Sequence, residues 1–465
     1  MRSDASRFSA CAFGTILSLP TVVFRAAPSL TAAVMDTVVI SALDQEGRGV
    51  ARIDGKAVFV EGALIGERVA IEVYRNKPNY ALARMTGLVE ASHERVAPPC
   101  PNFGVCGGCS LQHLEPLAQV AVKQRVLEDA LWHIARVRSQ QLLSPIYGPA
   151  WGYRQRARLS VRYVPKKGGV LVGFHEKKSS FVADMTTCPV LPPRISALLP
   201  KLRILVGALS ILDRLPQIEL AMGDGVEGEA LIFRHLAPLT AEDERELGAF
   251  AQRHDVHVYL QAAGPASIRP FFPAQSTLSY SLPDFAVRFE FEPRDFTQVN
   301  AAMNRMLVRR AIGLLGPEPG DRIADFFCGL GNFTLPIARR GAAVIGVEGS
   351  AALVQRAQMN AALNGLTERA RFVVGNLFEA NTESVAALGP LNKALIDPPR
   401  EGAIALVRSL PAQVSRVVYV SCNPATLARD AAALTGAQGF VLRAAGIANM
   451  FPHTAHVESV ALFER

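Results

Sequence analysis

The pattern of apolar and polar residues gives three parts of the chain different rhythms. From Thr37 to about Ser92 the apolar residues form short runs separated by Gly and Asn turns, which predicts a series of strands. The predicted strands cover residues 37–41, 49–53, 57–60, 68–74 and 81–89. Short strands so close together are typical of a small closed β-barrel of the OB type, a fold that often binds nucleic acid.

The middle part of the chain, residues 94–290, predicts a mixed α+β domain. A helix is expected over residues 112–137, and residues 153–163 alternate with the period-two pattern of a strand. Four basic side chains share one face of that strand: Arg154, Arg156, Arg158 and Arg162. Guanidinium groups in a row repel one another unless anions lie against them. A phosphate backbone is therefore the natural partner, and a solvated face paired with local acids is the alternative.

The last part, residues 291–465, alternates buried strands with helices. This rhythm predicts an α/β fold with a parallel, Rossmann-like sheet. Polar residues lie at the ends of successive predicted strands: Asp325, Glu348, Asn376, Asp397 and Cys422. Because the carboxyl ends of parallel strands meet at one edge of a sheet, the sequence predicts a ligand site there.

Cys422 follows a strongly apolar strand. The run from Val417 to Val420 predicts a buried strand, and Asn423-Pro424 ends it directly after the thiol. A cysteine at this edge can meet a substrate and act as a nucleophile. The alternative is a small buried residue that serves packing alone.

A glycine-rich turn precedes the acid that ends the next strand. Gly329 and Gly331 allow the backbone to approach a ligand, and Glu348 lies 23 residues after Asp325. That spacing matches the acid that binds ribose hydroxyls in nucleoside-binding sheets. The dinucleotide fingerprint of NAD enzymes needs a third glycine where this chain has Thr334, so NAD is disfavoured.

Composition adds a modest basic bias. The 465 residues are too many for one compact core, so two to three domains are expected. The net charge of +8 suits a polyanionic partner and equally suits a solvated basic surface. No apolar run is long enough for a membrane span, so no membrane partner is expected. Residues 1–35 are interpreted as a disordered leader or, preferably, as sequence upstream of a true start at Met35.

Four cysteines are grouped in a way that predicts a metal site. Cys100, Cys106 and Cys109 lie in a Gly-rich loop, and Cys188 follows far downstream. Four thiolates select zinc or an iron–sulfur cluster, and the spacing leaves both alternatives open.

Several motifs together resemble the RNA uracil-5-methyltransferases that use S-adenosylmethionine. The motifs are Asp325-Phe-Phe-Cys-Gly-Leu-Gly-Asn-Phe-Thr334, Asp397-Pro-Pro-Arg400, Val420-Ser-Cys-Asn-Pro424 and His456-Val-Glu-Ser459. The resemblance runs from about residue 36 to the end of the chain, and it divides the chain into three domains. Residues 36–93 resemble the TRAM domain, residues 94–290 a central domain with a [4Fe-4S] cluster, and residues 291–465 the catalytic domain.

The resemblance implies a role for each candidate site residue. Cys422 corresponds to the nucleophile that adds to C6 of uracil, and Glu458 to the base that removes the C5 proton. The cofactor contacts would be Gln298, Phe327, Asn332, Glu348, Asn376 and Asp397. The ligands of a [4Fe-4S] cluster would be Cys100, Cys106, Cys109 and Cys188. Cys328 is interpreted as a small turn residue rather than a second nucleophile.

The barrel and the cluster together resemble the branch of the family that acts on 23S ribosomal RNA. The implied substrate is a single-stranded loop uridine that is flipped into the pocket of a monomeric, cytoplasmic enzyme. Three alternatives stay open. They are the same reaction on another RNA, such as transfer RNA, a cytosine-5 methyltransferase, and a non-catalytic RNA-binding assembly factor.

Overall fold

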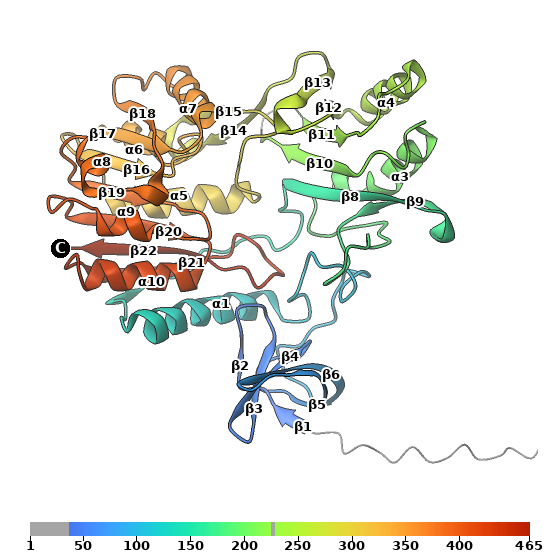
Figure 1. Cartoon of the computed structure of the whole chain (residues 1–465), viewed down its shortest axis with the longest axis horizontal. Coiled ribbons are helices and arrows are strands. Elements are labelled where there is room, and N and C mark those ends of the chain that lie inside the picture. Colours follow the sequence, from blue (N-terminus) through green and yellow to red (C-terminus); the bar gives the residue numbers. More distant parts are fainter. Residues whose placement is uncertain (1–36, 225–227) are drawn as a thin grey trace, which may run out of the picture.

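The computed structural model describes residues 37–224 and 228–465. The predicted leader and the proposed start at Met35 lie outside these described residues. Figure 1 presents the chain as a β-barrel, a central part with its own sheet, and a larger α/β part that carries the C-terminus.

The barrel is formed by a single curved sheet. Its strands are β1 (Thr37–Val39), β2 (Ala42–Leu43), β3 (Gly49–Ile53), β4 (Lys56–Glu61), β5 (Arg68–Asn76) and β6 (Tyr80–Glu90), in the order β1-β5-β6-β4-β3-β2. Only Ile40 and Ser41 separate β1 from β2, which pair with β5 and β3. The sheet therefore closes on itself around buried side chains such as Val58 and Val60. The predicted OB-type barrel is confirmed, and β2 is a short strand that the sequence pattern did not reveal.

The central part contains a second, largely antiparallel sheet. Its strands are β8 (Arg156–Val164), β9 (Gly169–Gly173), β10 (Gln217–Met222), β11 (Glu229–Arg234), β12 (His257–Gln261) and β13 (Ile268–Phe272), in the order β13-β12-β11-β10-β8-β9. Helices α3 (Leu199–Ala208) and α4 (Ala241–His254) pack against it around one apolar core. The alternation predicted for β8 is present, because Ala157, Leu159 and Val161 are buried.

The C-terminal sheet is parallel over most of its width. Its strands are β16 (Arg322–Phe326), β17 (Ala343–Glu348), β18 (Ala370–Val374), β19 (Lys393–Ile396), β20 (Arg416–Ser421), β21 (Val441–Ala448) and β22 (Glu458–Glu464). The order is β18-β17-β16-β19-β20-β22-β21, with β22 antiparallel to both of its neighbours. The strand order reverses between β16 and β19, which is where such sheets bind ligands. The predicted Rossmann-like fold is confirmed.

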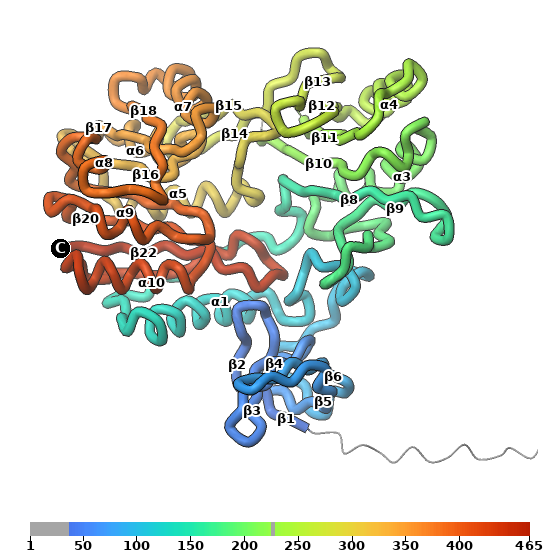
Figure 2. Tube along the Cα trace, viewed as in Figure 1, coloured from blue at the N-terminus to red at the C-terminus, as the bar shows by residue number. Residues whose placement is uncertain are grey.

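Helices cover both faces of this sheet. One face carries α5 (Ala301–Leu315), α6 (Thr334–Arg339) and α7 (Ala351–Leu363). The other carries α8 (Thr382–Ala386), α9 (Ile404–Arg408), α10 (Pro424–Thr435) and, from far upstream, α1 (Pro116–Ala130). Figure 2 shows α1 running alongside α10.

Packing therefore crosses the predicted boundary at residue 290. α1 shares a core with the C-terminal sheet, and β7 (Gln141–Leu142) adds to its edge beside β21. The hairpin of β14 (Leu278–Leu282) and β15 (Val287–Phe291) also joins the C-terminal core. The sequence places these segments in the central domain because a sequence shows which residues are neighbours along the chain. It does not show which segments pack together.

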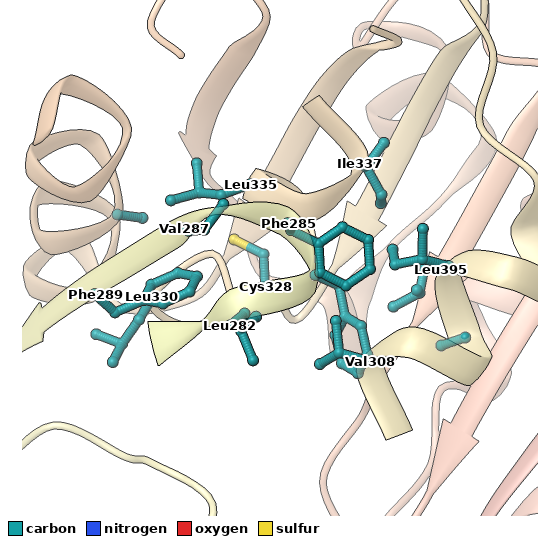
Figure 3. Packing of buried hydrophobic residues seen from close by; sticks show 14 of the residues in the cluster. Leu282, Phe285, Val287, Phe289, Val308, Cys328, Leu330, Leu335, Ile337 and Leu395 are labelled. Carbon is teal, nitrogen blue, oxygen red and sulfur yellow. The ribbon is translucent and has the colours of Figure 1, made fainter. Parts of the chain in front are cut away.

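Cys328 lies within that core. Figure 3 shows its sulfur surrounded by apolar side chains, among them Leu330, Leu335 and Val287. A Cβ built on Gly346 would lie 2.8 Å from this sulfur, so the glycine makes room for it. The thiol is 3% exposed and its pKa is raised well above the usual value by burial. These observations agree with a packing role for Cys328.

Candidate active site and four-thiol site

A cavity of about 590 Å³ lies at the carboxyl edge of the parallel sheet. The structure brings every predicted catalytic and cofactor-binding residue to its wall: Gln298, Phe327, Asn332, Glu348, Asn376, Asp397, Cys422 and Glu458. These side chains come from the carboxyl ends of β16 to β20, from the first residue of β22 and from the loop before α5, so the fold gathers residues that are up to 160 positions apart in sequence.

Strand register sets Cys422 opposite Glu458. The last pair of the β20–β22 ladder joins Ser421 to Ser459, and the next positions outward are Cys422 and Glu458. The hydroxyl of Ser459 donates to the carbonyl oxygen of Ser421 at 3.0 Å, which fixes this end of the ladder. A thiol and a carboxyl group are thereby held at one end of the cavity.

Burial gives these groups unusual proton affinities. Burial raises the pKa of Glu458 to about 8, and burial together with Glu458 raises that of Asp397 to about 8. Burial, Glu458 and Asp397 raise the pKa of Cys422 to about 11, and Arg400 opposes this shift. With these pKa values, the Cys422 thiol is neutral and Glu458 and Asp397 are mostly protonated at pH 7. A cation bound nearby would favour their ionised forms.

The glycine-rich turn orients the acid of the next strand. The carboxylate of Glu348 accepts hydrogen bonds from the backbone N–H groups of Gly329, at 3.1 Å, and Ser350, at 2.9 Å. Gly329 has φ +55°, a conformation that glycine adopts readily. Phe327 has φ +64° without being glycine, a strained backbone of the kind found at ligand sites. The turn thus presents an oriented carboxylate beside an aromatic ring.

Aromatic and amide side chains complete this half of the cavity. The rings of Phe327 and Phe378 meet edge to face with centroids 5.6 Å apart. Asn332 exchanges two amide hydrogen bonds with Asn304, each 3.0 Å long, and accepts a third from the hydroxyl of Tyr280. Aromatic surface next to oriented carboxylate and amide groups can bind a nucleoside.

One predicted strand-end residue does not reach the cavity. Asp325 is completely buried, and its carboxyl group accepts a hydrogen bond from the hydroxyl of Thr334. Burial raises its pKa to about 7. Asp325 is the penultimate residue of β16 and is not among the residues that line the cavity. The prediction that it faces the ligand edge is wrong.

Other residues of the wall carried no assigned role in the sequence. Arg400 and His456 stand inside recognised motifs, and Phe378 follows the strand end at Asn376 by two residues. Tyr280 comes from a hairpin in a stretch that gave no chemical signal. The motifs could have indicated the first two, whereas only the folded structure reveals Tyr280.

The four predicted metal-ligating thiols line a second cavity of about 250 Å³. Cys100, Cys106 and Cys109 lie on the Gly-rich loop, and Cys188 closes the site from the chain after β9. Within residues 37–224 and 228–465, no three Cys, His, Asp or Glu side chains are arranged to hold a single metal ion. The thiols instead face one another across the cavity.

Their proton affinities reflect this crowding. Burial raises the pKa of Cys109 to about 12 and that of Cys188 to about 11, with further contributions from the neighbouring cysteines. Burial also raises the pKa of Cys106, and Arg154 opposes that shift. Four thiolates would be stable here only around a positively charged group, and the cavity is larger than one ion needs.

The arginine strand does not present one continuous basic face. Arg154 lines the four-thiol cavity, and Arg156 donates to the carbonyl oxygen of Pro293 at 2.7 Å. Arg158 pairs with Glu219 at 3.2 Å but remains 70% exposed, and Arg162 is exposed. The predicted row of phosphate contacts is therefore reduced to Arg158 and Arg162, because the other two guanidinium groups face the protein.

Comparisons with known proteins agree with this geometry. The family described as tRNA (Uracil-5-)-methyltransferase matches residues 276–465, and the TRAM domain matches residues 37–86. A relative from Aromatoleum aromaticum, "23S rRNA (uracil(1939)-C(5))-methyltransferase RlmD", is 61% identical over 93% of this chain and 100% of its own length. A relative of the same name from Azoarcus sp. is 62% identical over the same shares. The chain belongs to the RNA uracil-5-methyltransferase family.

A solved structure of similar fold covers most of this uracil-5-methyltransferase. It is the Pyrococcus abyssi tRNA (uracil-54, C5)-methyltransferase in complex with S-adenosyl-L-homocysteine, with a TM-score of 0.70 over 92% of this chain and 100% of that one. The sequence identity is 24%, so the likeness concerns the fold. None of the helices in residues 37–224 and 228–465 has the length and hydropathy that crossing a membrane requires.

Proposed function

We propose that the protein transfers a methyl group from S-adenosylmethionine to C5 of one uridine in 23S ribosomal RNA, through a covalent bond between Cys422 and C6. The observation that carries this proposal is the register of β20 and β22, which sets Cys422 opposite Glu458 inside a nucleoside-sized cavity. The names of the relatives supply the RNA class.

The proposed reaction uses the two residues in turn. Uracil C5 is a weak nucleophile, so the Cys422 thiolate first adds to C6 and pushes the electron pair of the double bond toward C5. After C5 has been methylated, Glu458 removes the C5 proton. The electrons of that C–H bond form the C5–C6 double bond again, and the C6–S bond breaks to release Cys422.

The cofactor half of the cavity fits S-adenosylmethionine, which supplies an electrophilic methyl group when bound. Glu348 offers an oriented carboxylate to ribose hydroxyls, and Phe327 and Phe378 offer aromatic surface to the adenine ring. Gln298, Asn332, Asn376 and Asp397 provide further polar contacts around the ligand. A positive charge near Cys422 and Glu458 would favour the ionised forms that the reaction needs.

The RNA partner follows from the location of Cys422. C6 of a stacked base is inaccessible, so the uridine must be a single-stranded loop nucleotide flipped into the cavity. The TRAM barrel and the exposed Arg158 and Arg162 would hold the surrounding RNA. We propose that the enzyme acts as a monomer in the cytoplasm.

We propose that the second cavity holds a [4Fe-4S] cluster with Cys100, Cys106, Cys109 and Cys188 as ligands. The donor set supports this proposal: four thiols line one cavity of about 250 Å³, and four thiolates are the usual ligands of such a cluster. Complete coordination by four thiolates makes the cluster structural, because no iron is left open for chemistry.

The substitution Glu458→Gln tests the proposed reaction. This variant should still form the Cys422–C6 bond and accept the methyl group, but it cannot remove the C5 proton, so methylated RNA should remain attached. The measurement is a denaturing gel of protein, radiolabelled cofactor and a uridine-containing 23S fragment, with a transfer RNA and a cytidine-substituted fragment as matched substrates.

The control is the double variant Cys422→Ala/Glu458→Gln, which should trap nothing. Normal turnover by Glu458→Gln, or failure both to trap and to methylate, would show that Glu458 is not the base. A trapped transfer RNA with no trapped 23S fragment would reassign the substrate.

A further inference from the structure

A buried amino group on α1 supports the wall of the catalytic cavity. Lys123 is 1% exposed, and its Nζ donates to the side-chain oxygen of Asn449 at 2.7 Å and to the carbonyl oxygen of Phe451 at 2.8 Å. Among the described residues no carboxylate forms a salt bridge with it. Burying an amino group whose only partners are neutral oxygens costs folding free energy. The location of Lys123 therefore calls for a functional explanation.

The loop that Lys123 holds is part of the cavity. Phe451 and His456, on the connection between β21 and β22, both line it, and their rings meet edge to face with centroids 4.4 Å apart. Nε2 of His456 lies 3.8 Å from the carboxylate of Glu458 and has no hydrogen-bond partner within the described chain. The position of this imidazole beside Glu458 therefore depends on Phe451, which Lys123 fixes.

Other residues hold the same loop at a greater distance from the chemistry. The amide oxygen of Gln119 accepts a bond from the backbone N–H of His453 at 2.8 Å. The hydroxyl of Tyr153 donates to the carbonyl oxygen of Pro452 at 3.0 Å. These neutral contacts provide a comparison for the effect of an amino group.

We propose that Lys123 is a positioning residue for the catalytic cavity, which holds Phe451 and His456 in place beside Glu458. Lys123 touches neither substrate nor cofactor in this assignment. The proposal rests on the proposed function in taking Glu458 as the base, and it adds a residue that no catalytic motif contains.

The electrostatics of His456 support the same role. The charged or titratable groups that face it are Arg400, Lys123 and Glu458. Burial, Arg400 and Lys123 lower the pKa of His456 to about 4, so the imidazole is neutral at pH 7. Burial also lowers the pKa of Lys123 to about 7. Removing Lys123 should therefore raise the pKa of His456 and loosen the wall that it occupies.

The test compares Lys123→Met with Tyr153→Phe, which removes one neutral bond to the adjacent carbonyl group. We expect Lys123→Met to lower kcat roughly tenfold to a hundredfold, because small displacements near the reacting groups are costly. The Kd for S-adenosylmethionine should stay within about twofold of the wild type. Nuclear magnetic resonance of ¹³C-labelled histidines should show His456 titrating at a higher pH. Tyr153→Phe should change kcat by no more than about threefold and should leave the His456 titration unchanged. Lys123→Arg, which keeps a positive charge, should retain part of the kcat that Lys123→Met loses.

Equal losses of kcat in both variants with an unchanged His456 titration would overturn the proposal, since general loosening of the loop would explain them. Wild-type kcat in Lys123→Met would also overturn it. If Lys123→Met does not fold, Lys123→Gln replaces it, because its shorter polar side chain suits a buried polar site but takes the amino group away from the two oxygens. Failure of the proposed function would appear separately, as absence of trapped RNA in Glu458→Gln, a result that does not depend on Lys123.

Discussion

The two thiol-lined cavities of this protein are built in opposite ways. Cys422 stands at the end of a central strand, opposite Glu458 across a fixed ladder, and its neighbours are strand ends of the same sheet. Cys100, Cys106 and Cys109 stand on a loop, and Cys188 reaches them from another loop 79 positions beyond Cys109. The first site takes its geometry from the sheet. The second joins two loops that are fixed by their own hydrogen bonds, such as the one from the Gly107 N–H to the carbonyl oxygen of His175 at 2.9 Å.

This difference predicts how the two sites respond to change. The Cys422 site keeps its shape through backbone hydrogen bonds, so losing its thiol should remove chemistry and leave the fold intact. If the four thiols hold the proposed cluster, that cluster ties the Gly-rich loop to Cys188, so losing one thiol should damage the fold and leave the catalytic groups chemically unchanged.

The largest effect is expected from Cys422→Ala. Without the nucleophile no C6 adduct forms, and we expect methyl transfer to fall by about 10⁴-fold or more. The Tm, the Kd for S-adenosylmethionine and the affinity for RNA should stay close to wild type. Single-turnover methylation would measure the loss of chemistry, and calorimetry would measure the unchanged binding. A large loss of Tm would contradict the view that the Cys422 site does not depend on its thiol for its shape.

The next effect concerns the four-thiol site. Cys106→Ala should remove the brown colour of an iron–sulfur cluster and lower solubility and RNA affinity together. We expect a decrease in Tm of about 10 °C, the shift that roughly 3 kcal/mol produces in a domain of this size. Cys328→Ala is the matched control, because it removes a buried thiol from an apolar core without touching the four-thiol site. A colourless, soluble and fully active Cys106→Ala would contradict a structural cluster.

The same difference explains what could be predicted from sequence. Strand ends follow from local pattern, so Glu348, Asn376, Asp397 and Cys422 could be named in advance. Gln298, Phe327, Asn332 and Glu458 were named only through the family resemblance. Asp325 was misassigned because an acid at a strand end can point either toward the ligand or into the layer below, and pattern alone does not separate the two. The placement of α1 beside α10 could not be predicted, because it depends on packing between segments far apart in the chain.

The supporting groups were hidden for a similar reason. In the sequence, nothing distinguishes Lys123 from an ordinary lysine of a helix. Only the fold brings it against Asn449 and Phe451. Likewise the alternation of β8 gave the correct face for its arginines, but it could not reveal that Pro293 and the four-thiol loop cover part of that face.

A smaller effect is expected from a change of pH, and it distinguishes the carboxyl group of Glu458 from the other acids of the protein. Burial raises the pKa of Glu458 to about 8 in the folded state, so the folded protein binds this proton more tightly than the unfolded chain. Stability should therefore fall as pH rises from about 5 to about 8, while activity rises because the base becomes ionised. Tm and kcat/KM measured from pH 6 to 9 should move in opposite directions. In Glu458→Gln the decrease in Tm should be smaller, and an identical decrease would exclude this carboxyl group as its source.

The smallest effect is expected from the arginines of β8. Arg156 is bound to Pro293 near the catalytic cavity, whereas Arg158 and Arg162 are exposed and Arg158 shares its charge with Glu219. If the exposed pair meets phosphates, Arg158→Gln/Arg162→Gln should weaken RNA binding and reduce its salt dependence by about one unit of slope per lost contact. Arg156→Gln should leave the slope unchanged, because its guanidinium group already has a protein partner, and should instead lower kcat by disturbing the segment before Gln298. Binding titrations at several salt concentrations measure the slopes. An unchanged slope in the double variant would mean that this face is only solvated, and a reduced slope in Arg156→Gln would mean that RNA displaces the contact with Pro293.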